Sequence, residues 1–480
     1  MMKPLNNTTT QRTLRPVKIL QFGEGNFLRA FVDWMIEKAN KSGILNHGVA
    51  VVQPIRGGEE IASVFQNQDH LYHVYLEGIK NKQPVKEITR VECINALLNP
   101  YTQYDAYERL FLQEELEMII SNTTEAGIRY VEGDDLTASP PDSFPAKMTA
   151  LLYKRYQKYK GAPDKGLLII CCELIEDNGS VLRAYVLRHA QQNRLEQGFI
   201  TWIERSCHFY DTLVDRIVSG FPKENSDEIK KELGFDDHLL VKGEYFHVWA
   251  IGGDPVIRER FPLDKAGLNV LFMDDIRDFR ARKVRILNGS HTAMVPIALQ
   301  LGCQTVKEAF GIPEVEAFIT RMVETEVLPV IAGDQEELRQ FAAEILERFY
   351  NPFLHHYLKD ISLNALAKWE TRNYPTIWDN AKCNQKARFN RFAFAALLVL
   401  YAGHSKAIDF VPNDVAEHIT FIRQTFQRNN LRAWVTGIVT NKDIWRENIT
   451  QIPDFIEDVS DTIEQILTLG MENALKEVLL

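Results

Sequence analysis

The sequence predicts an α/β protein, with a Rossmann-type doubly wound sheet at residues 1–275 and a mostly α-helical domain at residues 276–480. Two observations predict this fold class. In the first half, short β-branched apolar runs alternate with longer amphipathic stretches, which is the pattern of βαβ units. From about residue 275 onward, apolar residues recur with the period of α-helices, so a helical domain follows.

The short apolar runs of the first half are the expected strands. Their apolarity is nearly continuous rather than alternating, which is typical of parallel strands covered by helices on both faces. The predicted strands are residues 17–22, 49–53, 118–121, 167–172, 245–251 and 268–273. The longest periodic stretches, predicted to be helices of the second domain, are residues 306–322, 338–349, 391–401 and 459–479.

The composition excludes several classes of protein. With 45% hydrophobic and 25% charged residues, the chain is typical of a folded globular protein. Its net charge of −10 has both signs mixed along the chain, so we expect no nucleic-acid partner. The most apolar windows are too short to span a bilayer, and the N-terminus lacks a signal-peptide pattern, so we expect no membrane partner. The six cysteines have no repeating spacing and indicate buried, reduced thiols in a soluble cytoplasmic protein.

A glycine turn follows the first predicted strand. Gly23 can form the tight turn, Gly25 lets the backbone approach a pyrophosphate, and the helix that follows presents its N-terminal N–H groups to that anion. Leu28 stands where a third glycine usually lies, so a purely structural turn is the alternative. The position after the first strand favours a dinucleotide site. The candidate cofactor-binding residues at this turn are Phe22, Gly23, Gly25, Asn26, Phe27 and Arg29.

The acidic residue that usually ends the second strand of a dinucleotide-binding fold is absent. That strand runs into Gln53 and then reaches Arg56, which could meet the 2′-phosphate of NADP or lie in a solvated loop. These residues leave the choice between NAD and NADP open. Polar residues after the strand at 118–121 could contact a ligand or cap the next helix. The candidate cofactor-binding residues there are Asn122, Thr123, Thr124 and Glu125.

Lys283, Asn288 and His291 are the catalytic candidates. On a regular helix with about 100° per residue, Asn288 lies roughly 140° and His291 roughly 80° around from Lys283, so the three share one broad face. A lysine whose pKa is lowered by burial can exchange a proton near neutral pH, while an amide and an imidazole can hydrogen-bond a developing alkoxide. Gly289 inside a helix costs about 1 kcal/mol relative to alanine, which a closely approaching ligand would offset. On spacing alone, an ordinary solvated helix face is the alternative.

Charged residues and histidines elsewhere suggest weaker candidates. Lys368 and Arg372 could hold a substrate carboxylate, the lysine as a point charge and the arginine as a bidentate fork. The histidine pairs at 70/73 and 355/356 could ligate a metal, but neither belongs to a recognisable ligand set. We therefore predict no metal site.

Three sequence blocks together carry a family resemblance. They are Gly23-x-Gly25-x-Phe27-x-Arg29, Val214-Asp215-Arg216-Ile217 and Lys283-x4-Asn288-x2-His291. In this order they resemble the mannitol dehydrogenase family of polyol-specific long-chain dehydrogenases, over nearly the whole chain. The resemblance implies a Rossmann-type domain, a helical second domain and no metal, and with it we expect NAD as the cofactor, with NADP not excluded. It also implies that Lys283 is the acid/base and that Asn288 and His291 polarise the substrate oxygen.

Longer blocks narrow the resemblance. Residues 21–34, 121–127 and 283–291 are similar to the family members that reduce tagaturonate to altronate, which implies a small hexuronate or aldonate substrate. Leu174 stands where mannitol-type members have an asparagine, and Asp360 and Leu363 stand where they have an arginine and a histidine. These departures are consistent with a substrate other than a neutral polyol. A fructuronate reductase, a hexitol dehydrogenase and a nucleotide-sensing protein without catalysis are the alternatives, and the oligomeric state is not predicted.

Overall fold

The computed structural model describes residues 2–80, 83–123, 127–353, 356–405 and 410–480. The chain divides into two compact units, of which the first ends at Ile276 and the second begins its main segment at Arg277. The first unit contains the large sheet and the second is built almost wholly from helices. The predicted fold class, a Rossmann-type sheet followed by a helix-rich part, is confirmed.

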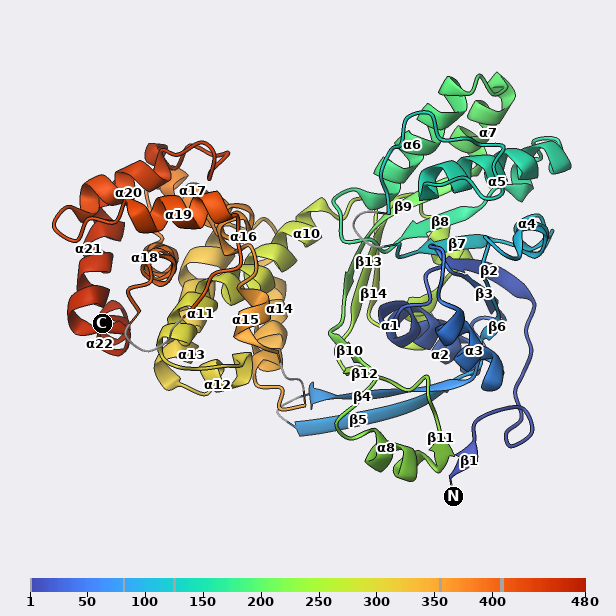
Figure 1. Ribbon diagram of the computed structural model, residues 1–480, viewed down its shortest axis with the longest axis horizontal. Helices are drawn as coiled ribbons and strands as arrows, with labels where there is room; N and C mark the ends of the chain where they lie inside the picture. The colour runs from blue at the N-terminus through green and yellow to red at the C-terminus, as the bar shows by residue number, and fades with distance from the viewer. Residues whose placement is uncertain (1, 81–82, 124–126, 354–355, 406–409) are drawn as a thin grey trace. The chain divides into compact units, whose positions relative to one another are not determined.

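An eight-stranded sheet forms the centre of the first unit (Figure 1). Its strands, in spatial order, are β14 (Val270–Met273), β13 (Val248–Gly252), β9 (His208–Asp215), β8 (Leu168–Cys171), β7 (Met118–Ser121), β2 (Val17–Phe22), β3 (Gly48–Val52) and β6 (Ile94–Leu98). Neighbouring strands are parallel except β9 and β13, which are antiparallel. The expectation of a wholly parallel sheet is wrong at this junction. The chain between β9 and β13 contributes to a second sheet and re-enters the first in the opposite direction, which needs no crossover on the sheet.

The second sheet of the first unit has four strands. In spatial order they are β10 (Val218–Gly220), β12 (Val241–Glu244), β4 (Tyr72–Lys80) and β5 (Gln83–Val91). The sequence predicts β2, β3, β7, β8, β13 and β14 within a few residues but no strand of this second sheet. In β5, exposed and partly buried residues alternate over much of its length, so it lacks the continuous apolar run used to predict strands.

Helices cover both faces of the large sheet. Because successive side chains of a strand point to opposite faces, Val51 of β3 enters one apolar core and Val52 enters the other. The Val51 side packs on α1 (Asn26–Leu28), the π-helical turn η1 (Arg29–Asp33), α2 (Trp34–Lys41) and α3 (Glu59–Asn67). The Val52 side packs on α4 (Tyr104–Phe111), α5 (Phe144–Tyr159), α6 (Asn178–Gln192) and α7 (Gln197–Ser206), of which α5, α6 and α7 lie together in Figure 1.

The second unit has two helices that are buried along nearly their whole length, α11 (Gly289–Gln300) and α18 (Arg388–Ala402). A helix buried all round belongs to the centre of a helical domain, and both helices contribute to one large apolar cluster. The helices around them are α10 (Arg277–Lys283), the π-helical turns η4 (Val284–Asn288) and η5 (Val323–Val327), α12 (Val306–Phe310), α13 (Pro313–Met322), α14 (Gln335–Phe349), α15 (Leu358–Ile361), α16 (Ala365–Arg372), α17 (Tyr374–Lys382), α19 (Ala416–Gln424), α20 (Leu431–Val439), α21 (Phe455–Leu469) and α22 (Met471–Val478).

Two long helices predicted from the sequence are each broken once. The stretch 306–322 splits into α12 and α13 because Pro313 starts a new helix, a position that its fixed φ and missing N–H suit. The stretch 459–479 splits into α21 and α22 at Gly470, whose φ of +82° ends the first helix.

Two expectations concern the burial of the cysteines and the presence of membrane-spanning helices. The cysteines are all free thiols, but Cys383 is exposed, contrary to the expectation that all six are buried. In the described part of the chain, no helix combines the length and apolarity needed to cross a membrane.

Candidate functional site

The predicted glycine turn lies at the carboxyl edge of the large sheet, between β2 and α1. Gly23 has a φ of +122°, and a Cβ on it would lie 2.9 Å from the backbone oxygen of Asn122, so the turn itself requires glycine there. Gly25 is different, because its φ is −65° and an added Cβ would meet nothing within 4 Å. The fold therefore leaves open space at Gly25, as close approach of a pyrophosphate to the backbone requires.

Replacing Gly25 with valine should weaken dinucleotide binding without unfolding the protein. The backbone angles and open space accept the side chain, which would then occupy the approach to the backbone N–H groups. We expect the cofactor dissociation constant, measured by nicotinamide fluorescence, to rise at least tenfold, or ~1.4 kcal/mol. Gly437→Val, at a second glycine whose Cβ would meet nothing, is the control. Unchanged binding by folded Gly25→Val would show that the cofactor lies elsewhere.

Two other residues predicted at this turn point into the protein. Arg29 is buried, and its guanidinium donates to the backbone oxygen of Leu239 at 2.6 Å and to the side-chain oxygen of Asn26. The Phe27 ring stacks on Phe31 with 5.0 Å between centroids. Asn26 is exposed at the turn. The arginine therefore acts on the turn through Asn26 and does not itself reach the exposed surface of the turn.

A buried carboxyl group lies beneath the glycine turn. Asp33 accepts hydrogen bonds from Nε2 of Gln21 at 3.3 Å and from the hydroxyl of Tyr72 at 3.2 Å. The same Gln21 amide donates to the backbone oxygen of Gly23 at 3.1 Å, which links the carboxyl group to the turn. Burial raises the pKa of Asp33 to about 7, because removal of the charged form from water outweighs the two hydrogen bonds.

Asp33→Asn should gain stability relative to the parent as the pH rises. The carboxyl group ionises near pH 3.8 in the unfolded chain but only near 7 in the fold, so within this window the folded state holds a proton that the unfolded state has lost. The parent therefore loses on the order of 1.4 kcal/mol of unfolding free energy for each pH unit, and the asparagine variant lacks this contribution. Urea unfolding at pH 5 and pH 8 measures the difference. If the difference in unfolding free energy between Asp33→Asn and the parent were the same at both pH values, the raised pKa of Asp33 would be contradicted.

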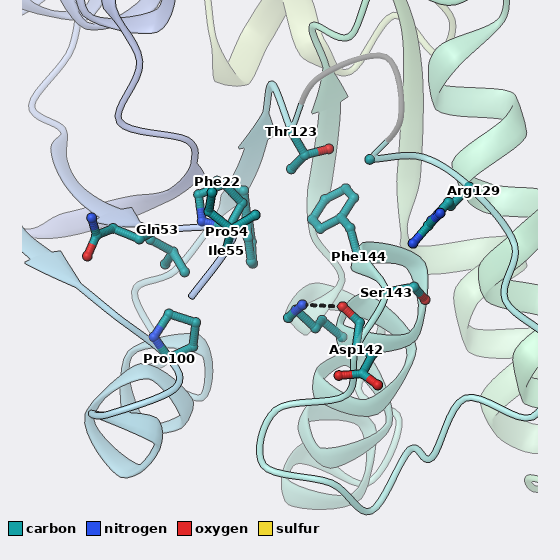
Figure 2. A pocket seen from close by; sticks show the side chains of 13 residues that line it. Phe22, Gln53, Pro54, Ile55, Pro100, Thr123, Arg129, Asp142, Ser143 and Phe144 are labelled. Atoms are coloured by element: carbon teal, nitrogen blue, oxygen red, sulfur yellow. Dashed lines mark hydrogen bonds between the residues drawn. The ribbon is translucent and has the colours of Figure 1, made fainter. Parts of the chain in front are cut away.

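A cavity of about 290 Å³ opens at the edge where β2, β3 and β7 end. The apolar walls formed after β3 and β6 suit a planar ring such as a nucleotide base. Figure 2 shows Phe22, Pro54, Ile55 and Pro100 on one side, Asp142, Ser143, Phe144 and Arg129 on the other, and Thr123 at the rim. The sequence predicts only Phe22 and Thr123 of this group, because the others come from separate loops and from the start of α5, and no sequence pattern indicates that these lie together.

Glu173 holds the second predicted cofactor segment in place. Its buried carboxylate accepts a hydrogen bond from Oγ of Ser121 at 3.0 Å, and from the backbone N and the hydroxyl of Thr123, each at 2.9 Å. The Asn122 amide donates to the backbone oxygen of Cys172 at 3.1 Å. No pattern in the sequence predicts this role of Glu173.

Thr124 and Glu125, which were predicted to bind the cofactor, lie outside the described residues. Leu174, which stands where mannitol-type proteins have an asparagine, is 64% exposed. The chain therefore places an exposed apolar side chain directly after the buried Glu173.

The catalytic candidates lie where one long helix changes its winding. Lys283 ends α10, Asn288 ends the π-helical turn η4, and His291 lies in the first turn of α11. π turns are rare and often mark functional sites. The regular 100° spacing assumed from the sequence does not hold across η4, so the predicted angles between the three residues are not those of the structure. Lys283 nevertheless lies close enough to His291 for its charge to influence that ring.

His291 is buried among positive charges. Its ring centroid lies 4.5 Å from that of Phe349, and Nε2 has no hydrogen-bond partner among the described residues. Burial lowers the pKa of His291 well below its ordinary value, so the ring is neutral near pH 7. The charges of Arg348, Arg372 and Lys283 lower it further, and we call these three residues the cationic cluster. His356 also lies beside the ring, and burial lowers its own pKa. A neutral imidazole with an unpartnered nitrogen can hydrogen-bond a substrate oxygen.

Arg372 and Lys368, the predicted carboxylate ligands, lie one helical turn apart on α16. The Arg372 guanidinium donates to the hydroxyl of Thr292 at 3.3 Å, which brings it to the residue after His291. Nζ of Lys368 donates to the backbone oxygen of Ile361 at 2.9 Å. Burial lowers the pKa of both groups, and the charge of Arg372 lowers that of Lys368 further.

Family models match both parts of the chain. The mannitol dehydrogenase Rossmann domain matches residues 17–265, and the mannitol dehydrogenase C-terminal domain matches residues 275–467. The chain belongs to the mannitol dehydrogenase family. The resemblance inferred from its sequence blocks is therefore confirmed.

Individual relatives agree with this membership of the mannitol dehydrogenase family. An altronate oxidoreductase of Bacillus subtilis (strain 168) is 41% identical over 482 residues, covering 99% of this chain and 98% of that protein. A substrate-free D-sorbitol dehydrogenase has the same fold, with a TM-score of 0.83 and 19% identity over 99% of this chain and 100% of that one. Pseudomonas fluorescens mannitol 2-dehydrogenase, in a ternary complex with NAD and D-mannitol, has a TM-score of 0.72 and 20% identity over 100% and 96% of the two chains.

In this mannitol dehydrogenase family chain, a buried hydrogen-bond network holds the turn that ends at Asn288. Asn373 donates to the backbone oxygen of Gly289 at 3.1 Å and to Oδ1 of Asn390 at 2.9 Å. Asn390 in turn donates to the carboxylate of Glu326 at 2.8 Å. The network fixes Gly289 against the end of α16. A Cβ on Gly289 would lie 3.5 Å from the nearest backbone oxygen there, so the helix end, and not a ligand, lies beside this glycine.

The histidines considered as metal ligands have other neighbours. Nδ1 of His73 lies 3.0 Å from the buried carboxylate of Asp237, and the ring of His70 lies beside Phe65. His355 is outside the described residues, and the ring centroid of His356 lies 5.0 Å from that of His291. Within the described part of this mannitol dehydrogenase family chain, no group of three histidine, cysteine or acidic side chains could hold a metal ion.

Proposed function

We propose that this protein is an NAD-dependent reductase that interconverts tagaturonate and altronate. The observation that carries the proposal is the cationic cluster around the neutral His291, with Lys368 beside Arg372. A keto-uronate brings a carboxylate, which these charges attract, whereas a neutral polyol has no group that needs them. The full-length similarity to an altronate oxidoreductase supports the same substrate.

The glycine turn and its cavity, both in the first unit, would bind the cofactor. The open space at Gly25 and the cavity with apolar walls both fit a dinucleotide. Gly25 and Asn26 would hold the pyrophosphate, while Pro54 and Ile55 would contact the base. When bound, the reduced nicotinamide supplies the hydride that reduces the carbonyl carbon.

Residues of the second unit would hydrogen-bond the substrate oxygen and exchange a proton with it. Lys283, as an ammonium, donates a proton to the carbonyl oxygen, which becomes the new hydroxyl group. The amide of Asn288 and the neutral ring of His291 hydrogen-bond this oxygen while negative charge develops on it. Arg372 and Lys368 hold the carboxylate and so orient the substrate. In the reverse direction, Lys283 as a neutral amine accepts the proton.

An absorbance assay tests the proposal directly. Nicotinamide absorbance is followed with tagaturonate, fructuronate and fructose, each with NADH and with NADPH. We expect the highest kcat/KM for tagaturonate with NADH. Faster reduction of fructuronate would identify the other keto-uronate as the substrate, and faster reduction of fructose would indicate a hexitol dehydrogenase. Cofactor binding without turnover of any of the three would favour the nucleotide-sensing alternative.

A further inference from the structure

Glu24 places a carboxylate beside the end of β3, where the sequence lacks the acidic residue usual in dinucleotide-binding folds. Dinucleotide-binding folds usually have an acidic residue at the end of the second strand, where it hydrogen-bonds the ribose hydroxyl groups. Here Gln53 follows β3 at that position. Glu24, from the glycine turn, reaches across to it, with 3.4 Å between its Oε1 and Nε2 of Gln53.

The Gln53 amide is held firmly enough to orient this carboxylate. The side chain is buried, its Nε2 also donates to the backbone oxygen of Gly58 at 3.1 Å, and its backbone N donates to Leu98 at 2.9 Å. Gly58 has a φ of +84°, and a Cβ on it would lie only 2.2 Å from that Nε2. The loop after β3 therefore packs tightly, at Gly58, against the Gln53 amide that contacts Glu24.

Two cations near this position, Arg56 and Lys147, have other contacts, and Arg129 lies on the cavity wall opposite Pro54 and Ile55. The guanidinium carbon of Arg56 lies 5.2 Å from the ring centroid of Tyr101, a cation–π distance. Nζ of Lys147, in the cavity wall, donates to the backbone oxygen of Asp142 at 2.6 Å and to the Tyr101 hydroxyl at 3.1 Å. Both positive charges thus lie against Tyr101, while Glu24 lies at the end of β3.

We propose that Glu24 selects NAD over NADP. Its carboxylate would accept a hydrogen bond from the ribose 2′-hydroxyl of NAD and would repel the 2′-phosphate of NADP. Gln53 would hold Glu24 in place, and Glu24 would then do the work of the acidic residue that is missing at the end of β3. This proposal rests on the proposed use of a nicotinamide dinucleotide by this chain.

Equilibrium binding tests this role independently of turnover. Dissociation constants for NADH and NADPH are measured by nicotinamide fluorescence for the parent, Glu24→Gln and the second charge-removing variant Glu24→Ser. Glu60→Gln, which removes the same charge from an exposed position on α3, is the control. We expect the parent to bind NADH at least tenfold more tightly than NADPH. Both Glu24 variants should reduce this ratio at least tenfold, mainly through tighter NADPH binding, and the control should preserve it.

Each other outcome overturns a different part of the argument. A parent that binds NADPH more tightly would contradict both the proposed NAD dependence and the role of Glu24. A parent that prefers NADH, with the ratio unchanged in both folded Glu24 variants, would refute the role of Glu24 alone. Equal weakening of NADH and NADPH in those variants would show that Glu24 only shapes the turn, which also overturns the proposal.

Discussion

Lys283→Ala should lower turnover by roughly 10² to 10⁴-fold, the usual contribution of a general acid/base. The substitution removes the group that gives the substrate oxygen its proton. Cofactor binding should remain unchanged, because the glycine turn and its cavity are built from residues of the other unit. Steady-state kinetics with tagaturonate and nicotinamide fluorescence measure the two effects separately.

Two controls separate proton transfer from packing at this position. Lys283→Met keeps most of the side-chain volume and should be as slow as Lys283→Ala. Lys307→Ala, at an exposed lysine on α12, should leave turnover unchanged.

The pH dependence of the parent provides a second measurement of the role of Lys283. Oxidation of the alcohol needs the neutral amine and should increase with pH, whereas reduction needs the ammonium and should decrease. A folded Lys283→Ala protein with near-normal turnover, or with the parent's pH profile, would mean that another group supplies the proton. His291 would then be the next residue to replace.

Arg372→Ala should raise KM for the keto-uronate at least tenfold more than KM for a neutral ketose. The guanidinium lies by Thr292, next to His291, where its positive charge is available to a carboxylate but has no matching group on fructose. Lys368→Ala should have the same selectivity with a smaller effect, because a single ammonium lacks the bidentate geometry of arginine. Kinetics with tagaturonate and fructose measure both.

Arg372→Lys and a surface control make this test specific. The lysine variant keeps the charge but loses the planar fork, so its KM for the keto-uronate should lie between those of the parent and Arg372→Ala. Arg339→Ala, which removes an exposed arginine from α14, should change neither KM. An equal rise in KM for both substrates would reject Arg372 as the carboxylate ligand.

The fold class could be predicted because apolar patterning is a local property. A buried parallel strand such as β2 or β8 must be apolar on both faces, so a short continuous run is visible in the sequence. β9 is not predicted by this pattern, because His208, Tyr210 and Asp211 interrupt its apolar residues. Helix breaks at Pro313 and Gly470 were visible as residue types, but the periodicity on either side concealed them.

By itself the sequence determined the fold class, the glycine turn and the block that contains Lys283, because each depends on residues close together in the chain. Only the tertiary structure decided that Gly23 serves the fold while Gly25 leaves space for a ligand. It also decided that Glu24 meets Gln53 and that the cationic cluster gathers around His291. These contacts join residues from separate strands and helices, and charges act through space, so they exist only once the elements have packed.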